Sequence, residues 1–234
     1  KTMGDAVWSM YDYNRGCCDN ICYSGVADIF RLPKFSLSFF RTQIAEGSML
    51  PSGKMPYEVF IPAYRDEILS DTVMVYGNVD EVELVLNGKT IRRQTADKGP
   101  DSDYIPVPNG GNGKNLHFPP FTFYGVPKER GVLKAVGYHQ GKKVAEYTVK
   151  TPGVPERLDI TYFESGKPAT KNDLLIVYVR MLDKQGVLCP VNGIPVELSV
   201  QGGEIVGPTS YPLEAGVASF LVRTGEISKI NINA

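Results

Sequence analysis

Alternation of apolar and polar residues over Glu81–Asn87 is the feature that most constrains the fold of this chain. Apolar side chains take every second position from Val82 to Leu86, which is the period of a strand with one face buried in a core. An Asn87-Gly88 pair follows, and both central residues of a type I′ turn need the positive φ that Asn and Gly tolerate. The pattern therefore predicts a hairpin whose second strand returns antiparallel over Thr90–Thr95.

Similar short segments, each bounded by turn residues, follow one another along most of the chain. A first group of strands is expected at Tyr57–Pro62, Thr72–Asn78, Leu133–His139 and Lys143–Lys150, the last two joined at Gln140-Gly141. A second group is expected at Arg157–Phe163, Leu174–Leu182, Val196–Val200 and Val217–Arg223, with turns at Asp183–Gly186 and Asn192-Gly193. Short strands separated by turns are typical of immunoglobulin-like β-sandwiches. The sequence thus predicts a mainly β fold with two sandwich domains, residues 56–150 and 156–234, joined by a stiff linker at Thr151–Pro155.

The N-terminal 47 residues follow a different pattern. Asp5–Tyr11 contains a short apolar run, as expected of a strand covered on both faces, and a polar loop follows over Asp12–Ser24. Pro33 is expected in the first turn of a helix, where it begins an apolar stripe with Leu37, Phe40 and Ile44. A buried strand followed by an amphipathic helix is half of a parallel β/α unit. Residues 1–47 are therefore predicted to be the last unit of a (β/α)8 barrel, with 48–55 as a linker.

The predicted helix is short and contains Ser36, Ser38 and Thr42, which do not favour helix formation. A helix of this length is marginal by itself. We expect it to be ordered only where it packs on the first sandwich or on a neighbouring molecule.

Several segments carry a resemblance to a known family. WSMYDYNRG, the DNICYSG that follows it, and GVADIFRLPKFSLSFFRTQ resemble the end of the catalytic barrel in glycoside hydrolase family 2, which includes β-galactosidases and β-glucuronidases. In that family the eighth barrel strand ends in a Trp, and an Arg-x-Pro-Lys sequence, here Arg31–Lys34, introduces the last helix. Downstream, VMVYGNVDEVELVLNGKTI and GVLKAVGYHQGKKVAEYTVKTPGVPERLDI resemble the β-sandwich domains that follow the barrel in many members.

The resemblance implies that the chain is the C-terminal part of a retaining β-glycosidase, β-galactosidase-like, that degrades carbohydrate. Such enzymes use one Glu as acid/base and another as nucleophile, about 5 Å apart. The resemblance puts both residues upstream of Lys1, and no Glu occurs in the chain before Glu46. By itself the chain is expected to be inactive, and none of its residues is predicted to be catalytic.

Substrate-contact residues are expected at the carboxyl end of the eighth barrel strand, because barrel enzymes place their active sites at that end. The resemblance implies that the indole of Trp8 packs against the apolar face of a sugar ring. The residue type alone fits equally well an indole that fills the mouth of the barrel. Asp12, Asn14 and Arg15 are predicted to supply polar groups at the rim of the site.

Charge and hydropathy indicate the expected partners. The chain has 25 Lys and Arg against 26 Asp and Glu, a net charge of −1, and no basic stripe of the kind that binds nucleic acid. No apolar run is long enough to cross a bilayer. The expected partner is therefore carbohydrate rather than nucleic acid or membrane, and no cofactor is expected. An unpaired edge strand in the second sandwich would favour a homo-oligomer. The resemblance implies a periplasmic or secreted bacterial protein and leaves a cytoplasmic location open.

Three of the four cysteines, Cys17, Cys18 and Cys22, lie close together, whereas Cys189 is distant. The C-C-x3-C spacing does not match the paired spacing of zinc sites, so no metal site is predicted. We interpret these residues as thiols packed or exposed in a loop. A disulfide from Cys17 or Cys18 to Cys22, which would suit an oxidising compartment, is the competing interpretation.

The segment Asp97–Asn115 is rich in Gly, Pro and Asn and too irregular for a strand. Asp97, Asp101 and Asp103 lack the order of a calcium-binding loop. Tyr104 lies near Asn109 and Asn112 and could touch a sugar. We interpret the segment as a surface insertion.

Two roles remain open for residues 56–234. Both domains could be scaffolding, or one could be a carbohydrate-binding module that holds polysaccharide near the barrel. Phe118, Phe121, Phe123 and Tyr124 could form a sugar-binding platform. Aromatic residues in alternating strands are more often part of a core, so we favour the scaffold interpretation.

Overall fold

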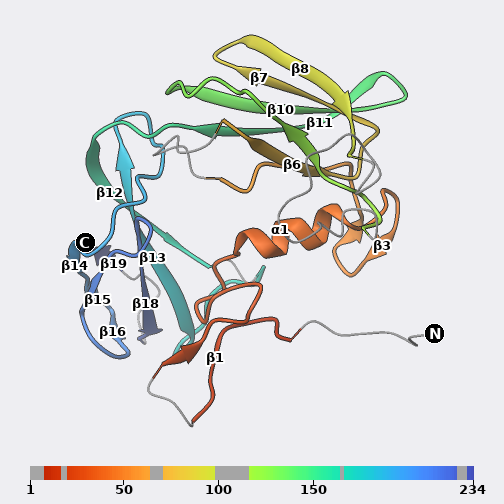
Figure 1. The fold of residues 1–234 in the computed structure, drawn as a ribbon. Helices are drawn as coiled ribbons and strands as arrows, with labels where there is room; N and C mark the ends of the chain where they lie inside the picture. Colours follow the sequence, from red (N-terminus) through yellow and green to blue (C-terminus); the bar gives the residue numbers. More distant parts are fainter. Residues whose placement is uncertain (1–7, 17–19, 64–70, 98–115, 164–165, 226–230) are drawn as a thin grey trace. The chain divides into compact units, whose positions relative to one another are not determined.

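The computed structural model describes residues 8–16, 20–63, 71–97, 116–163, 166–225 and 231–234. The chain divides into two compact units, Lys1–Thr151 and Pro152–Ala234, and the boundary falls within the segment predicted to be a linker. Both units consist mainly of antiparallel strands, and the helix α1 (Phe35–Thr42) belongs to the first unit (Figure 1). No helix of the described residues is long and apolar enough to cross a membrane.

In the first unit a four-stranded and a three-stranded antiparallel sheet enclose one core. The four-stranded sheet has the order β11 (Lys142–Lys150), β10 (Val132–His139), β7 (Glu81–Leu86) and β8 (Lys89–Thr95). The three-stranded sheet has the order β5 (Val59–Phe60), β6 (Val73–Gly77) and β9 (Phe121–Phe123). Two small ladders pair β1 (Tyr13–Asn14) with β2 (Ile21–Cys22) and β3 (Met49–Leu50) with β4 (Gly53–Lys54).

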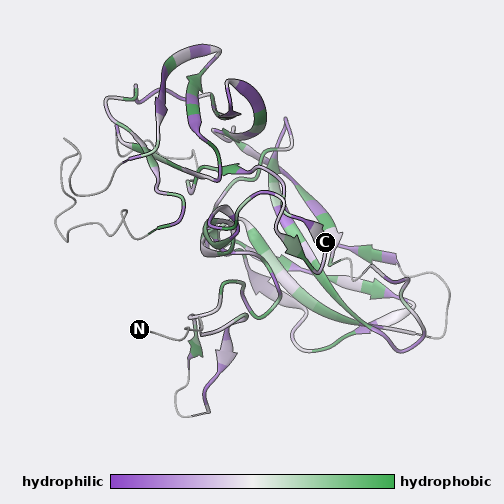
Figure 2. Cartoon of the chain, turned by 90° about the vertical axis from the view of Figure 1, so that its right-hand side faces the viewer, coloured by the Kyte–Doolittle hydropathy of each residue, from purple (hydrophilic) through white to green (hydrophobic). Residues whose placement is uncertain are grey.

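The predicted hairpin at Asn87-Gly88 is confirmed. Asn87 has φ 51° and Gly88 has φ 80°, and Leu86 pairs with Lys89 across the turn. Val82, Leu84 and Leu86 are buried, whereas the residues between them are half-buried. Figure 2 shows the same alternation as hydrophobic and hydrophilic colours along the strands. This face of β7 packs with residues from both sheets in the core of the unit.

Strand β9 was not predicted from the sequence. It contains two of the four aromatic residues of the predicted sugar-binding platform. Phe121 and Phe123 have no exposed surface and belong to the core of the first unit. Tyr124 is partly exposed, and Phe118 is half-buried. The prediction of a platform made of all four rings is therefore wrong, because two of these rings fill the space between the sheets.

The helix begins later than predicted and buries a different face. Pro33 precedes α1, and its first-turn position is wrong, because Lys34 is the extended N-cap residue and its amide donates to the carbonyl of Val26 at 3.0 Å. The ring of Phe35 packs against that of Phe60, with ring centres 5.7 Å apart, and the ring of Phe39 packs against that of Tyr76, with ring centres 5.0 Å apart.

At about 100° per residue, Phe35, Phe39 and the buried Thr42 lie on one side of α1. The predicted stripe lies on the opposite side, where Phe40 is exposed and Leu37 and Ile44 are half-buried. The helix thus has two apolar faces, and the sequence pattern did not identify the one whose rings contact Phe60 and Tyr76.

Two side-chain amides, those of the half-buried Gln43 and the buried Asn78, fix the end of the helix to the first sandwich. Gln43 exchanges hydrogen bonds with the backbone of Phe118, donating from Nε2 at 3.0 Å and accepting at Oε1 at 3.1 Å. Asn78 donates from Nδ2 to the carbonyls of Ile44 and Pro56, both at 3.0 Å, and accepts from the amide of Glu58. The segment predicted to be a linker, 48–55, instead forms the β3–β4 hairpin and ends in Met55, which is buried.

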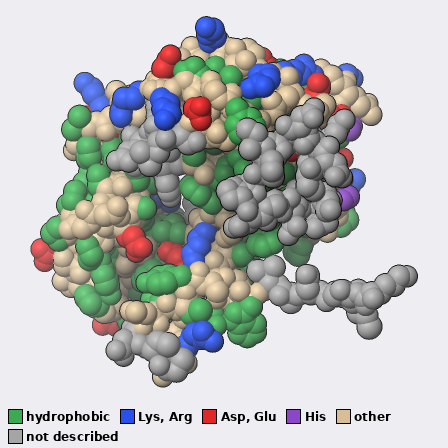
Figure 3. Space-filling model, viewed as in Figure 1, with side chains coloured by type: hydrophobic (Ala, Val, Ile, Leu, Met, Phe, Trp, Pro, Cys, Tyr) green, Lys and Arg blue, Asp and Glu red, His purple; other side chains and the backbone are tan. Residues whose placement is uncertain are grey.

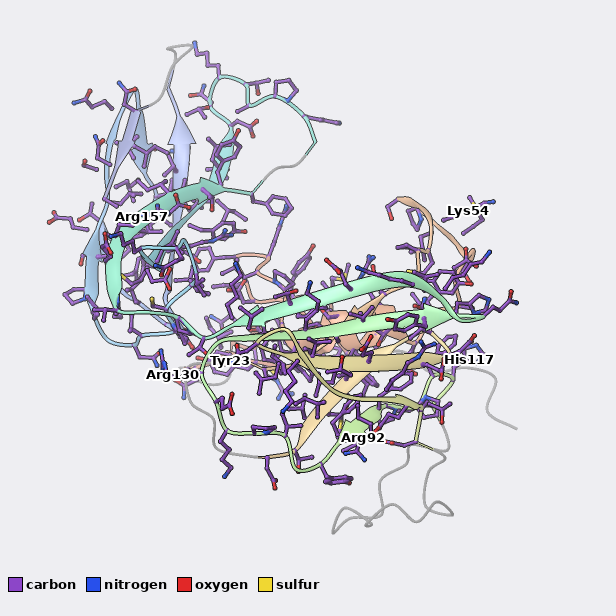
Figure 4. All side chains as sticks on the ribbon, turned by 90° about the horizontal axis from the view of Figure 1, so that it is seen from above. Tyr23, Lys54, Arg92, His117, Arg130 and Arg157 are labelled. Atoms are coloured by element: carbon purple, nitrogen blue, oxygen red, sulfur yellow. The ribbon has the colours of Figure 1, made fainter. Side chains whose placement is uncertain are left out.

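The outer surface of the four-stranded sheet carries charges of both signs. Figure 3 shows Lys and Arg side chains beside Asp and Glu side chains at the top of the view, where Figure 1 labels β7 and β8. Arg93 of β8 pairs with Glu81 of β7, and its guanidinium lies 3.7 Å from the ring centre of Tyr138. Arg92, labelled in Figure 4, donates to the carbonyl of Tyr124 at 3.1 Å. These contacts hold the edge strand β8 to its neighbours.

The second unit is a smaller arrangement of antiparallel strands around its own core. Its main sheet has the order β12 (Pro155–Tyr162), β13 (Leu174–Asp183), β18 (Val217–Thr224) and β16 (Gly203–Ile205). Shorter ladders pair β14 (Pro195–Glu197) with β17 (Ser210–Pro212), and β15 (Ser199–Gln201) with β19 (Asn231–Asn233). The single strand predicted over Val196–Val200 is thus two strands, because its halves pair with different partners.

Asp183 fixes the start of the second unit. Its carboxylate accepts hydrogen bonds from the amides of Gly153 at 2.7 Å, Val187 at 2.8 Å and Gln185 at 2.9 Å. These amides, Gly153 foremost, hold the pKa of Asp183 below its ordinary value.

A carboxyl group with a depressed pKa in the folded state stabilises that state above its ordinary pKa, and the contribution is lost as pH falls through the depressed value. We therefore expect Asp183→Asn to lower the melting temperature of the second unit by several degrees at pH 7. Below pH 4 the variant should lose less stability than the unchanged protein does. Asn would point an N–H₂ donor at the Gly153 amide or at the Gln185 and Val187 amides. Hydrogen exchange of β12 and β13 measures the effect. Asp159→Asn, which makes the same charge change at a more exposed carboxylate, should behave like the unchanged protein.

Candidate functional site

The segment from Trp8 to Lys34 contains all the predicted substrate-contact residues and is held by backbone hydrogen bonds between its two ends. The amide of Ser9 donates to the carbonyl of Ser24 at 3.3 Å, and the carbonyl of Ser9 accepts from the amide of Val26 at 3.1 Å. The amide of Asp12 donates to the carbonyl of Ala27 at 3.0 Å. Residues 8–12 and 24–27 therefore run together as one unit.

The predicted buried strand Asp5–Tyr11 is not found in the described part of this range. Residues 5–7 lie outside the described residues, Tyr11 forms only an isolated parallel bridge with Ala27, and Trp8 and Met10 are 74% and 63% exposed. A strand is covered on both faces only when neighbouring strands and helices surround it. In the described part of the chain the indole of Trp8 contacts the ring of Tyr13, but most of the surface of Trp8 and of Met10 is left exposed.

Gly25 allows this close pairing of the two ends. A Cβ atom at this position would lie 2.3 Å from the amide nitrogen of Asp12 and from the carbonyl carbon of Tyr11. Both atoms belong to the backbone, so neither can move aside as a flexible side chain would. Only Gly lets the chain approach Asp12 at this distance.

Trp8 presents its indole face to solvent while its polar edge is occupied. The Nε1–H group donates to the hydroxyl of Tyr13 at 2.8 Å. The two rings meet edge to face, with centres 6.1 Å apart and planes inclined at 79°. An exposed indole face beside polar side chains suits the apolar side of a sugar ring. Contact between Trp8 and a sugar stays a prediction.

Asp12 occupies a buried position rather than the predicted rim. Its side chain is 3% exposed, and Oδ1 accepts from the amide of Gly25 at 2.9 Å and from Nζ of Lys34 at 2.6 Å. The Lys34 ammonium also donates to the carbonyl of Tyr23 at 3.0 Å. We name this arrangement the Asp12–Lys34 clamp. A carboxylate engaged in this way holds the loop and leaves little surface for a substrate hydroxyl.

Asn14 is the exposed last residue of β1, and Arg15 follows it. Oδ1 of Asn14 accepts from the amide of Gly16 at 2.8 Å and so shapes the turn that follows. Arg15 is exposed. Their substrate contacts, like that of Trp8, remain predictions.

Cys22 faces Tyr13 across the β1–β2 ladder and carries a free thiol. Hydrogen bonds from Ser24 and then Tyr13 lower the pKa of this thiol. Cys17 and Cys18, the other members of the predicted cysteine group, lie outside the described residues. In the described part of the chain, no three Cys, His, Asp or Glu side chains lie close enough together to hold a metal ion.

A tight turn brings Lys34 to the clamp. Oδ1 of Asp28 accepts from the amide of Leu32 at 2.8 Å, Arg31 has φ 68°, and burial raises the pKa of Asp28. Lys34 belongs to the Arg-x-Pro-Lys motif, but no role in the site was predicted for it. Tyr13, which lies between the predicted residues Asp12 and Asn14, was not predicted either. The two members of the clamp are 22 positions apart, so no local spacing signals their contact.

The predicted loop Asp97–Asn115 contributes only Asp97 to the described residues. Its carboxylate accepts from the hydroxyl of Thr122 at 2.8 Å, and burial raises its pKa. The residues discussed as calcium ligands or sugar contacts, Asp101, Asp103, Tyr104, Asn109 and Asn112, lie outside the described residues.

Comparison with known proteins gives a consistent set of relatives. A family model described as a domain of unknown function, DUF4982, matches residues 70–145. The chain is 32% identical to a β-galactosidase of Thermoanaerobacter pseudethanolicus, over 94% of this chain and 30% of the relative. It is 29% identical to the β-galactosidase BoGH2A of Bacteroides ovatus, over 87% of this chain and 22% of the relative. A third relative, a β-galactosidase of Rhizobium radiobacter, is 30% identical over 47% of this chain and 78% of the relative.

Solved structures share the fold. A β-glycosidase from Bacteroides vulgatus superposes with a TM-score of 0.72 at 17% identity, over 97% of this chain and 28% of that chain. A β-glucuronidase from glycoside hydrolase family 2 superposes with a TM-score of 0.70 at 21% identity, over 91% of this chain and 21% of that chain. The chain thus spans less than a third of the length of these structures and of the first two relatives.

Proposed function

Because the chain belongs to glycoside hydrolase family 2, the family of β-galactosidases and β-glucuronidases, we propose that it is the C-terminal accessory part of a longer retaining β-glycosidase. The observation that carries the proposal is the alignment with the T. pseudethanolicus β-galactosidase, which extends over 94% of this chain but only 30% of the relative. In this proposal the catalytic pair of Glu residues belongs to a barrel encoded upstream, and the present chain has no turnover of its own.

We propose that residues 1–47 complete that barrel as its last β/α unit. Two features of the described residues support this assignment. The side of α1 that carries Leu37 and Phe40 is apolar and is opposite the side whose rings contact Phe60 and Tyr76, and Ile44 follows just beyond the helix. Trp8 and Met10 expose large apolar surfaces, as the end of a strand would after removal of its neighbours.

For the sandwich domains, residues 56–150 and 156–234, we propose a scaffold role. The burial of Phe121 and Phe123 favours scaffold over carbohydrate-binding module, because an aromatic platform needs rings that face solvent. The hydrogen bonds of Gln43 and Asn78 join α1 to the first of these domains. A domain fixed to the last helix of a barrel in this way would hold that helix in position.

Within the site, we propose that Trp8 packs against the sugar at the reacting centre and that Asn14 and Arg15 lie at the rim. Asp12 is reassigned to holding the loop, since its carboxylate is buried in the clamp. The chemical part of the reaction, protonation and nucleophilic attack, then falls to residues outside this chain.

Assay of the 234-residue chain against the longer enzyme tests the proposal. The isolated chain should not hydrolyse aryl β-galactosides or aryl β-glucuronides at any pH, whereas a protein that also contains the upstream barrel should hydrolyse one of them. Addition of the barrel as a separate polypeptide should restore activity if the two parts associate. Turnover by the isolated chain alone would refute the accessory assignment. Binding of polysaccharide to residues 56–234 would favour the module over the scaffold.

A further inference from the structure

Trp8 is the only tryptophan of the chain, and its backbone is already anchored. Both the amide and the carbonyl of Ser9, the next residue, are hydrogen-bonded, to Ser24 and Val26. The indole could still turn about its side-chain torsions, since 74% of the residue is exposed. A flat apolar surface that can turn freely would lose conformational entropy each time it bound a ligand.

The hydroxyl of Tyr13 accepts a hydrogen bond from Nε1, the one polar atom of the Trp8 indole. An indole can only donate through Nε1–H, whereas a phenol both accepts and donates. The Nε1–O distance of 2.8 Å is that of a well-formed hydrogen bond. The ring of Tyr13 stands at 79° to the indole, so it contacts the indole without stacking on its face.

Tyr13 is itself held in place. It lies in β1 and pairs with Cys22 of β2, and after Ser24 its side chain is the next largest cause of the lowered pKa of the Cys22 thiol. The Cys22 sulfur lies 3.4 Å from the Ser24 hydroxyl, and Ser24 is the residue whose carbonyl accepts from Ser9. The side chains of Trp8, Tyr13, Cys22 and Ser24 thus form one continuous series of contacts that returns to the backbone beside Trp8.

We propose that Tyr13 is a positioning residue for the substrate surface of Trp8: its hydroxyl holds the indole edge in one orientation and leaves the face free for a sugar. The functional part of this inference rests on the proposed function of Trp8. Tyr13 does not touch the reacting atoms and acts only through the indole.

Tyr13→Phe is the sharpest test, because it removes the hydroxyl and keeps the ring. In the 234-residue chain the single indole N–H gives one NMR resonance, and loss of a hydrogen bond of ordinary strength should speed its exchange with solvent about fivefold. The anisotropy of Trp8 fluorescence should also decay faster. Tyr23→Phe is the matched control, since Tyr23 lies on the same loop and is 71% exposed; it should change neither signal. Unchanged indole exchange in Tyr13→Phe would overturn the proposal.

The functional readout uses the longer enzyme. In the enzyme that keeps Trp8, Tyr13→Phe should lower kcat/KM about fivefold. In the Trp8→Phe variant the same change should have no effect, because a Phe side chain has no N–H group for the Tyr13 hydroxyl to bind. A general structural role for Tyr13 would instead give the same loss in both backgrounds and would refute positioning. If Trp8→Ala lowers kcat/KM while Tyr13→Phe leaves it unchanged, only the present inference fails. If Trp8→Ala itself has no effect, the proposed role of Trp8 fails and the functional part of the inference with it.

Discussion

Lys34→Met is expected to destabilise the Trp8–Lys34 segment by about 2–3 kcal/mol, because it leaves the Asp12 carboxylate buried without its cation. The Asp12 side chain is 3% exposed and that of Lys34 is 32% exposed. A fully buried pair would lose about 3–5 kcal/mol on removal of one partner, and the partial exposure of Lys34 reduces this figure. Met keeps most of the aliphatic stem, so the loss reports the ammonium group and its contacts with Asp12 and the Tyr23 carbonyl.

Hydrogen exchange of the Gly25 and Asp12 amides measures this effect, because both are fixed within the segment. The decisive comparison is the double variant Asp12→Asn/Lys34→Met, which removes the unpaired charge and should be more stable than Lys34→Met alone. Lys54→Met is the control, since Lys54 is an exposed residue of β4 (Figure 4). Equal exchange in Lys34→Met and Lys54→Met would show that the clamp contributes nothing measurable.

The parts of the fold that follow from local chemistry could be predicted from the sequence. The β7–β8 hairpin is encoded within a few residues, by the alternation of β7 and by the Asn87-Gly88 pair. The β10–β11 hairpin has the same origin, with Gln140 and Gly141 both at positive φ. Strand period and turn chemistry act over short distances, so no knowledge of the rest of the chain is needed.

The helix shows why the rest could not be predicted. Its sequence has apolar residues on two opposite sides, and periodicity alone cannot say which side meets the sandwich. The contacts of Phe35 and Phe39 with Phe60 and Tyr76 decide this. Its start is likewise displaced from Pro33 because Lys34 is held extended. These are long-range contacts that override local preferences.

In the candidate site, too, some features could be predicted from the sequence and others depend on the fold. The resemblance indicated the loop and Trp8, whereas the side chain of Asp12, predicted at the rim, is buried and paired with Lys34. Contact between Asp12 and Lys34 depends on how the chain returns through Gly25, which tolerates no side chain there. The residues that support a site are less visible in a sequence than the residue that faces the ligand, because their partners are set by the fold.

Trp8→Ala should lower kcat/KM of the longer enzyme for its aryl β-glycoside by about 100-fold, which corresponds to about 2.7 kcal/mol of transition-state stabilisation. The reason is positional: a sugar that has lost the surface it rests on reaches the catalytic carboxylates in the correct orientation less often. In the 234-residue chain Trp8 is 74% exposed, and Trp8→Ala should change its stability by less than about 0.5 kcal/mol, as is usual for exposed substitutions.

Trp8→Phe separates the aromatic surface from the hydrogen bond to Tyr13. It keeps a flat apolar face and removes the N–H group, so its loss in kcat/KM should be clearly smaller than that of Trp8→Ala. Thermal unfolding of both variants should match the unchanged protein, because the cores of the two units do not include Trp8. An unchanged kcat/KM in Trp8→Ala would assign the indole to packing within the barrel mouth. Family membership would stand in that case, because it rests on the similarity of the whole chain and not on this residue.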